Sequence, residues 1–228
     1  MLKLYYHNTP NPTKVALLLE EIAMPYEVVG LDIWTGAQHS ADYRAINPNG
    51  KVPAIVDGDV VMFDSNAILL HLAEKAGQFL GEAKDRPQLL SWLMFTATGL
   101  GPFAGQAFHF VHVHKDSPYS TNRYLREVER HLSVLDKQLG RSAWLVGASY
   151  SIADMAAWAW VDFCERNGFV FGADGAARWP HLKRWLDAIN ARPAASRARN
   201  AGANLKVKTE FDEETVRALF PQNFADRL

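Results

Sequence analysis

The order of strand-like and helix-like segments over the first 80 or so residues constrains the fold of this chain more than any other feature. Two strand-like segments, LKLYYH and YEVVGLDI, flank the helix-like segment TKVALLLEEIAM, and an irregular stretch leads to the short strands VPAIVD and VVMFD. Gly58 and Asp59 form a favourable tight turn between these last two strands. In the helix that follows, SNAILLHLAEKAG, we expect Ser65 as the N-cap and Gly77 as the C-terminal stop. The order β-α-β-α-β-β-α predicts an α/β domain.

The sequence changes character near residue 85, where strand patterns end and long helical patterns begin. In YSIADMAAWAW, Ser151 and Asp154 have the spacing of a capping box at the start of a helix. In RYLREVERHLSVLDKQLG, apolar residues recur at steps of three and four, which predicts a helix with one face toward a core: Leu125, Val128, Leu132, Leu135 and Leu139. We therefore expect an α/β domain over residues 1–82 and an all-helical domain with a C-terminal extension over residues 88–228.

Composition and charge favour small molecules or proteins as partners, rather than nucleic acid or membranes. The 228 residues are 48% apolar and 21% charged, which is enough apolar sequence to bury one or two cores. The net charge of -1 gives no overall basic field that would attract nucleic acid or an anionic membrane. No apolar run approaches the roughly 20 residues of a membrane span, and MLKLYYHNTP has too short an apolar run for a signal peptide. We expect a cytoplasmic protein.

The cysteine and histidine content argues against metal or disulfide chemistry by the chain itself. The single cysteine, Cys164, allows no intrachain disulfide, no CxxC pair and no cysteine-based zinc site, and its helical context predicts a buried free thiol. His109, His112 and His114 are close in sequence, but on a helix the third points away from the other two. We therefore expect no metal site, and expect Phe108, His109 or His112 to pack between helices or to line a substrate pocket.

Two neighbouring motifs suit the binding of a peptide that carries an amino acid head group. Pro53 enters a strand, and if the Val52-Pro53 bond is cis, the backbone of Val52 turns outward and can pair with an extended peptide. Asp64 and Ser65 follow at a junction of strand and helix, where the helix N-terminus and the hydroxyl suit a carboxylate and Asp64 suits an ammonium group. Each feature also has a purely structural explanation, with Pro53 turning the chain and Ser65 capping a helix.

Five segments carry a resemblance to a known family: TPNPTKVALLLEE, NPNGKVPAIVD, FDSNAILLHLAEK, GLGPFAGQAFHF and YSIADMAAWAW. They resemble the glutathione transferases, and most of all the nu class, whose bacterial members are described as glutathione-dependent disulfide-bond reductases related to the yeast nitrogen-regulatory prion protein. The resemblance extends over nearly the whole chain. It implies a thioredoxin-like first domain, a helical second domain, a homodimer, and glutathione as the co-substrate.

The resemblance also implies roles for individual residues. Val52, beside a cis Pro53, would pair its backbone with the cysteinyl residue of glutathione. Asp64 and Ser65 would hold the γ-glutamyl amine and carboxylate, although the family commonly has the longer Glu at the first position. Arg123 would reach glutathione across a dimer interface, whereas its sequence alone suggests a solvated helix face. Three more residues match glutathione contacts: Asn11, Gln38 and Lys51.

The turn HNTPNPT, residues 7–13, contains no Cys, Tyr or Ser that could activate or bond a sulfur. Thr9 and Asn11 can donate hydrogen bonds, and with the helix N-terminus after residue 11 they can stabilise a thiolate and lower its pKa from the roughly 8.5 of a free thiol. We therefore expect these two as the catalytic residues. Tyr5 and Tyr6 lie earlier, in the strand, on opposite faces of the sheet, where core packing is the favoured role for each.

The reactive sulfur then comes from the ligand, and the predicted reaction converts one disulfide and two glutathione molecules into two thiols and oxidised glutathione. Weak peroxide reduction would accompany it. One alternative is conjugation of glutathione to an electrophile in an apolar pocket built from Phe103, Phe108 and Trp158. Another is a glutathione-binding regulatory protein without catalysis. The tail FDEETVRALF would cover the site, extend a dimer, or do neither.

Overall fold

In the first domain, four strands form one sheet that is covered by three helices. The computed structural model describes residues 1–169 and 175–224. The strands, β1 (Leu2–Tyr6), β2 (Tyr26–Gly30), β3 (Ala54–Asp57) and β4 (Val60–Phe63), lie in the order β2-β1-β3-β4. β1 pairs parallel with β2 and antiparallel with β3, and β3 pairs antiparallel with β4. With α1 (Pro10–Glu21), α2 (Ala41–Ile46) and α3 (Ser65–Ala76), this confirms the predicted α/β order.

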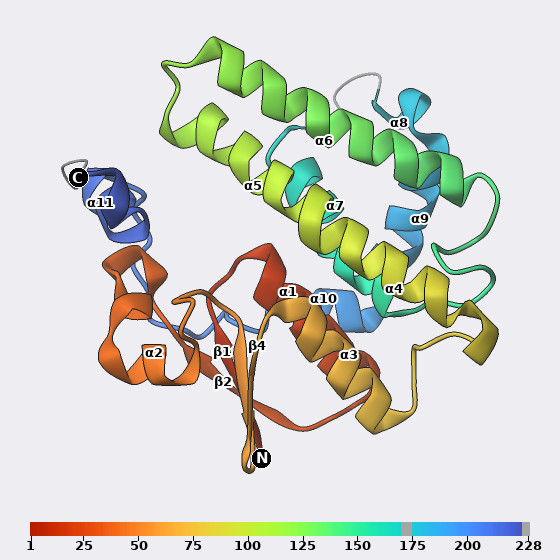
Figure 1. Ribbon diagram of the computed structural model, residues 1–228, viewed down its shortest axis with the longest axis horizontal. Coiled ribbons are helices and arrows are strands. Elements are labelled where there is room, and N and C mark those ends of the chain that lie inside the picture. Colours follow the sequence, from red (N-terminus) through yellow and green to blue (C-terminus); the bar gives the residue numbers. More distant parts are fainter. Residues whose placement is uncertain (170–174, 225–228) are drawn as a thin grey trace.

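The helices of this domain lie on opposite faces of the sheet. Figure 1 shows α1 and α3 on the face toward the rest of the molecule and α2 on the other face. The run Val15–Leu19 in α1 is completely buried, because the sheet, α3 and two helices of the second domain surround this helix. A helix that is apolar on all sides is the expected sequence for such a position.

All regular secondary structure in the described part of the second domain is helical (Figure 1). Its first four helical segments follow one another without a break: α4 (Arg86–Phe95), η4 (Thr96–Leu100), α5 (Gly101–Phe108) and η5 (His109–Val113). The long helix α6 (Pro118–Leu139) packs antiparallel against them. The remaining helices are α7 (Ile152–Arg166), α8 (Gly175–Arg178), α9 (Pro180–Asn190), α10 (Pro193–Arg199) and α11 (Glu213–Leu219). Among the described residues, no helix is long and apolar enough to cross a membrane.

The predicted apolar face of α6 packs into the core. Val128, Leu132, Leu135 and Leu139 are buried, and Leu125 packs against the same core while remaining partly exposed. The stripe therefore has the predicted orientation.

The capping box of α7 is present and is a structural feature. The buried carboxylate of Asp154 accepts hydrogen bonds from the backbone N–H of Ser151 at 3.0 Å and of Leu145 at 2.9 Å, and from the indole of Trp185 at 2.9 Å. Burial raises the pKa of Asp154 to about 6. Because these donors come from three separate segments, this one side chain joins the start of α7 to the loop before it and to α9.

Two predicted helix starts were wrong. The N-cap of α3 is Asp64 and not Ser65: one oxygen of the Asp64 carboxylate accepts the N–H groups of Asn66 at 2.9 Å and Ala67 at 3.1 Å, while Ser65 is the first helical residue. A carboxylate reaches these free N–H groups of the first turn as well as a hydroxyl does. The C-terminal stop at Gly77, with φ of 65°, is confirmed. Helix α1 begins at Pro10 rather than after residue 11, since proline is well tolerated in the first turn.

Candidate functional site

A groove in the first domain brings together eight of the nine residues that were predicted to bind glutathione or to stabilise its thiolate. It encloses about 280 Å³ between the β1–α1 turn, the loop before β3 and the start of α3. Its lining includes Thr9, Asn11, Gln38, Lys51, Val52, Pro53, Asp64 and Ser65. These residues come from segments as far apart in sequence as the first and third helices, so their convergence is a property of the fold.

The loop before β3 presents an unpaired stretch of backbone to this groove. The Val52-Pro53 peptide bond is cis. The preceding carbonyl of Lys51 accepts hydrogen bonds from the Tyr43 hydroxyl and the Asn47 amide, both at 2.6 Å, which fixes the loop. The N–H and C=O of Val52 have no hydrogen-bond partner within the described chain. An extended peptide in the groove can therefore pair with Val52 as a further strand.

The start of α3 closes the other end of the groove. Asp64 uses one carboxylate oxygen to cap the helix, and its second oxygen makes no hydrogen bond to any described residue. Ser65 is 6% exposed, and its hydroxyl is likewise unpaired within residues 1–169 and 175–224. A free carboxylate oxygen, a hydroxyl and a helix N-terminus together suit an α-amino acid head group.

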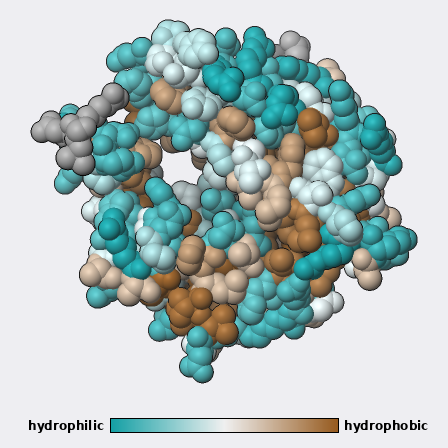
Figure 2. Space-filling view, in the orientation of Figure 1, coloured by the Kyte–Doolittle hydropathy of each residue, from teal (hydrophilic) through white to brown (hydrophobic). Residues whose placement is uncertain are grey.

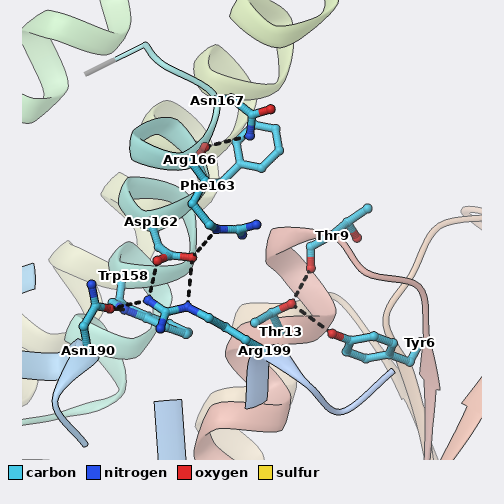
Figure 3. Close-up of polar contacts among 10 residues, drawn as sticks. All are labelled: Tyr6, Thr9, Thr13, Trp158, Asp162, Phe163, Arg166, Asn167, Asn190 and Arg199. Carbon is cyan, nitrogen blue, oxygen red and sulfur yellow. Dashed lines mark hydrogen bonds and ion pairs between the residues drawn. The ribbon is translucent and has the colours of Figure 1, made fainter. Parts of the chain in front are cut away.

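A chain of hydrogen bonds from β1 and the first turn of α1 fixes the β1–α1 turn. The Tyr6 hydroxyl pairs with the Thr13 hydroxyl at 3.2 Å, and the Thr13 hydroxyl donates to the carbonyl of Thr9 at 2.9 Å (Figure 3). Tyr6 is completely buried, which raises the pKa of its phenol, and the ring of Tyr5 packs against Tyr43 with 5.5 Å between centroids. Neither Tyr5 nor Tyr6 lines the groove, in agreement with the packing role expected for each.

The amide of Asn11 is oriented by a residue of the second domain that the sequence did not single out. The indole Nε1 of Trp160, on α7, donates a hydrogen bond to Oδ1 of Asn11 at 3.2 Å. Because an indole N–H can only donate, the bonded atom of Asn11 must be its oxygen, and the NH₂ group is left for the groove. No described residue accepts a hydrogen bond from this NH₂ group.

A second cavity, which we call the aromatic pocket, adjoins the groove at Thr9. It encloses about 390 Å³, and its lining includes Trp34, Phe108, Trp160, Phe163, Phe211 and Phe220. The pocket expected from sequence is correct for Phe108 and wrong for Phe103 and Trp158. Trp158 is completely buried and donates to Asn190 at 2.8 Å, whereas Phe103 packs on Tyr124 and His131. Residues two apart on a helix point in nearly opposite directions, so α7 presents Trp160 rather than Trp158 to the pocket.

The predicted histidine positions differ in their surroundings. His109 lines the aromatic pocket and packs edge-on against Phe220, with 4.9 Å between centroids. His112 packs against Phe108 in a tilted arrangement, with 4.8 Å between ring centroids. Burial lowers the pKa of both imidazoles. Across residues 1–169 and 175–224, no group of three His, Cys, Asp or Glu side chains could hold a metal ion.

The C-terminal segment covers both cavities. The carbonyl of Ala218 accepts a hydrogen bond from Gln38 at 3.3 Å, and Phe211 packs edge-on against Trp34 at 5.4 Å. Leu219 lines both the groove and the aromatic pocket. Figure 1 shows α11 beside the first domain, and Figure 2 shows the surface hollowed between this segment and the helical domain. The tail therefore covers the site, which is one of the three possibilities that the sequence left open.

A buried lysine lies beneath the site, and sequence reasoning missed it. Lys14 is 1% exposed and donates from Nζ to Oδ1 of Asn66 at 2.7 Å. It lines a cavity of about 450 Å³ between the two domains, together with Asp64, Ser65 and Thr96, whose buried hydroxyl has no partner among the described residues. Burial lowers the pKa of Lys14 to about 7, against a smaller opposing effect of the Asp64 charge. The signal in the sequence was a single charge at the start of the otherwise apolar run KVALLL.

Two further residues lie away from these cavities. Cys164 is completely buried and burial raises its thiol pKa to about 12, so it cannot act as a resolving thiol. Arg123 is exposed on α6 and does not line the groove. Within one chain, therefore, Arg123 is the predicted ligand that the fold does not bring to the others.

Comparison with known proteins shows the family and the fold of the chain. Family models for the glutathione S-transferase N-terminal and C-terminal domains match residues 1–74 and 100–193. Disulfide-bond oxidoreductase YfcG of Escherichia coli is 41% identical over 207 residues, which are 87% of this chain and 94% of YfcG. A glutathione transferase from Burkholderia graminis, solved with two glutathione molecules per subunit, has 34% identity and a TM-score of 0.81, and the match covers 90% of this chain and 89% of that one.

A second solved structure has a different ligand state. A glutathione transferase from Pseudomonas putida, with one glutathione disulfide bound per subunit, has 36% identity and a TM-score of 0.79, and the match covers 87% of this chain and 90% of that one. The family and the fold that the sequence motifs predicted are thereby confirmed. The chain belongs to the glutathione S-transferase family.

Proposed function

We propose that this protein is a glutathione-dependent disulfide-bond oxidoreductase. The observation that carries the proposal is the meeting of the groove and the aromatic pocket at Thr9. A tripeptide paired with Val52 and held by Asp64 and Ser65 has its middle residue, the cysteine, opposite the β1–α1 turn. A similar relative is named a disulfide-bond oxidoreductase, and similar structures hold glutathione or its disulfide.

The chemistry requires no nucleophile from the protein. The Thr9 hydroxyl, the Asn11 NH₂ group and the N-terminus of α1 stabilise the glutathione thiolate, which attacks one sulfur of the bound disulfide. The old sulfur–sulfur bond breaks, the leaving thiolate takes a proton, and a mixed disulfide remains. A second glutathione thiolate attacks the glutathione sulfur of that mixed disulfide and releases the second thiol. The sum is one disulfide and two glutathione consumed, with two thiols and one glutathione disulfide formed.

The state of assembly and the cell compartment are part of the proposal. We propose a cytoplasmic homodimer that joins through the edge strand β4 and helix α4. Val61, Phe63 and Met94 leave between 43% and 51% of their surface exposed in this region. In such a dimer the exposed Arg123 is available to a groove of the partner.

Glutathione-dependent reduction of hydroxyethyl disulfide tests the proposal, with Thr9→Ala and Asn11→Ala as variants. Each variant should lower kcat/KM by about tenfold or more, the loss expected for one charge-assisted hydrogen bond. Thr98→Ala and Asn200→Ala remove an exposed Thr and an exposed Asn that line neither the groove nor the aromatic pocket, and these variants should leave turnover unchanged. Absence of disulfide turnover in the wild type would contradict the proposal.

Conjugation of glutathione to an electrophile is a second candidate, because the aromatic pocket opens beside the same turn. An aryl halide assayed with the same variants separates the two. Brisk conjugation without disulfide reduction would favour the second candidate. Failure of calorimetry to detect glutathione binding would contradict both.

A further inference from the structure

Arg166 is one of two arginines that share a single buried carboxylate. Asp162, on α7, is 2% exposed and pairs with Arg199 at 2.5 Å and with Nε of Arg166 at 2.9 Å. Figure 3 shows this carboxylate between the two guanidinium groups. A second contact joins Arg199 to Asp162, at 3.4 Å. Since Arg199 already neutralises Asp162, the cluster has one positive charge in excess.

The excess charge faces the aromatic pocket. Arg166 lines this pocket, and in Figure 3 the end of its guanidinium extends from α7 toward the turn that carries Thr9. Only its Nε is used for Asp162, and neither terminal nitrogen has a hydrogen-bond partner within the described chain. The side chain is 50% exposed. A guanidinium remains protonated at any physiological pH, so these nitrogens are permanent donors.

No acidic side chain opposes this charge in the pocket. None of the described residues that line it is Asp or Glu, and apart from His109 the lining is apolar or uncharged. The planar fork of a guanidinium matches a carboxylate, and an apolar surrounding strengthens the resulting pair. The pocket therefore combines an apolar wall, one cation whose terminal nitrogens are free within the described chain and, at Thr9, the end of the glutathione groove.

We propose that the aromatic pocket selects a thiol or disulfide that carries a carboxylate, and that Arg166 pairs with this carboxylate while the substrate sulfur lies beside Thr9. The proposal rests on the proposed function and specifies its substrate class. Two molecules supply such a carboxylate: an acidic disulfide, or the second glutathione that completes the exchange. Both present the same chemistry to Arg166, and kinetics separate them.

Three disulfides of similar length provide the test at saturating glutathione: dithiodipropionate with two carboxylates, hydroxyethyl disulfide with no charge, and cystamine with two ammonium groups. The wild type should prefer the acidic disulfide. Arg166→Gln should raise KM for dithiodipropionate by about tenfold or more, the loss of one charge-assisted hydrogen-bonded pair. It should change the KM for hydroxyethyl disulfide little and lower the KM for cystamine, because the repulsion between like charges is removed. Arg166→Lys should restore part of the preference because it restores the charge.

Arg197→Gln is the matched control. Arg197 is 54% exposed and pairs with one carboxylate, that of Glu20, but it does not line the pocket. This variant should retain the wild-type preference among the three disulfides. Circular dichroism of each variant verifies that the helices are intact.

A second set of rates distinguishes the two sources of the carboxylate, the acidic disulfide and the second glutathione. In these assays the glutathione concentration is varied at saturating hydroxyethyl disulfide. A higher KM for glutathione in Arg166→Gln, without a change in disulfide preference, identifies the second glutathione. A changed disulfide preference alone identifies the acidic disulfide. An Arg166→Gln variant that changes neither the preference among the three disulfides nor the KM for glutathione would overturn the proposal.

A binding measurement tests the role of Arg166 without requiring that the protein reduces disulfides. S-methylglutathione fills the groove without a reactive sulfur, and calorimetry then measures dithiodipropionate binding in its presence. Binding that weakens in Arg166→Gln supports the carboxylate site even if no disulfide is turned over, in which case only the proposed function fails. Equal binding to wild type and Arg166→Gln overturns the carboxylate site, whatever the turnover.

Discussion

The indole of Trp160 donates a hydrogen bond to the side-chain oxygen of Asn11 at 3.2 Å. The helical domain thus fixes the orientation of an amide in the turn of the α/β domain. The two residues are 149 positions apart in sequence. The contact links the assembly of the two domains to the geometry of the sulfur site.

Trp160→Phe should impair catalysis more than glutathione binding. The variant keeps an aromatic ring in the pocket but leaves the Asn11 amide free to turn, so its NH₂ group no longer points at the sulfur. We expect kcat for disulfide reduction to fall about three- to tenfold, the equivalent of one neutral hydrogen bond, with a smaller change in the Kd of glutathione. Trp144→Phe, whose ring packs on Tyr150 away from the cavities, is the control. An unaltered kcat in Trp160→Phe would show that the hydrogen bond between Trp160 and Asn11 has no catalytic role.

Tyr6→Phe should retain disulfide reduction to within about twofold, because the Tyr6 hydroxyl is buried against Thr13 and does not reach the groove. Thermal unfolding should reveal a modest loss of stability, since the fixed turn loses one hydrogen bond. A large loss of kcat in a folded Tyr6→Phe protein would mean that the phenol acts on the sulfur.

Lys14 should make the stability of the protein depend on pH. Its pKa is about 7 in the folded protein and near 10.5 when exposed, so between these values the unfolded chain binds more protons than the folded chain. Stability therefore increases as pH rises from about 7 toward 10.5, by at most ~1.4 kcal/mol per pH unit, and this group contributes no slope below 7.

Urea unfolding of the wild type and of Lys14→Met at several pH values measures this effect. The wild type should gain stability relative to Lys14→Met as the pH increases above 7. Lys137→Met, which replaces an exposed lysine on α6, should follow the wild type at every pH. Parallel pH profiles for the wild type and Lys14→Met would contradict the prediction.

Phe211→Ala should loosen the C-terminal segment over the site. It removes the edge-on contact with Trp34 and part of the aromatic wall, while the capped start of α11 at Asp212 stays intact. We expect faster dissociation of glutathione in stopped-flow fluorescence, where Trp34 is a nearby reporter. An unchanged dissociation rate would show that the tail does not retain the ligand.

Much of the fold and the groove followed from the sequence, because both depend on local patterns. Alternating burial defines β1, steps of three and four define α6, and the motifs around Pro53 and Asp64 place ligand groups at the ends of adjacent elements. The wrong N-cap at Ser65 has a local cause as well, since Asp64 and Ser65 are both good capping residues and the pattern does not rank them.

The missed residues depend on contacts between segments far apart in sequence. The choice between Trp158 and Trp160 is set by the rotation of α7 against α1, which the pattern AAWAW leaves open. The burial of Lys14 arises only when α3 and the second domain close over α1, and the tail reaches Gln38 across 180 positions. The periodicity of a helix contains no information on any of these contacts between distant segments.

The pKa of the bound glutathione thiol tests the central claim most directly. Ultraviolet absorbance of the thiolate, followed against pH with saturated protein, gives this value. The account predicts a pKa well below the roughly 8.5 to 9 of a free thiol, with a return toward that value in Thr9→Ala and in Asn11→Ala. A bound thiol that titrates like free glutathione, or a lowered pKa that neither variant changes, would contradict it.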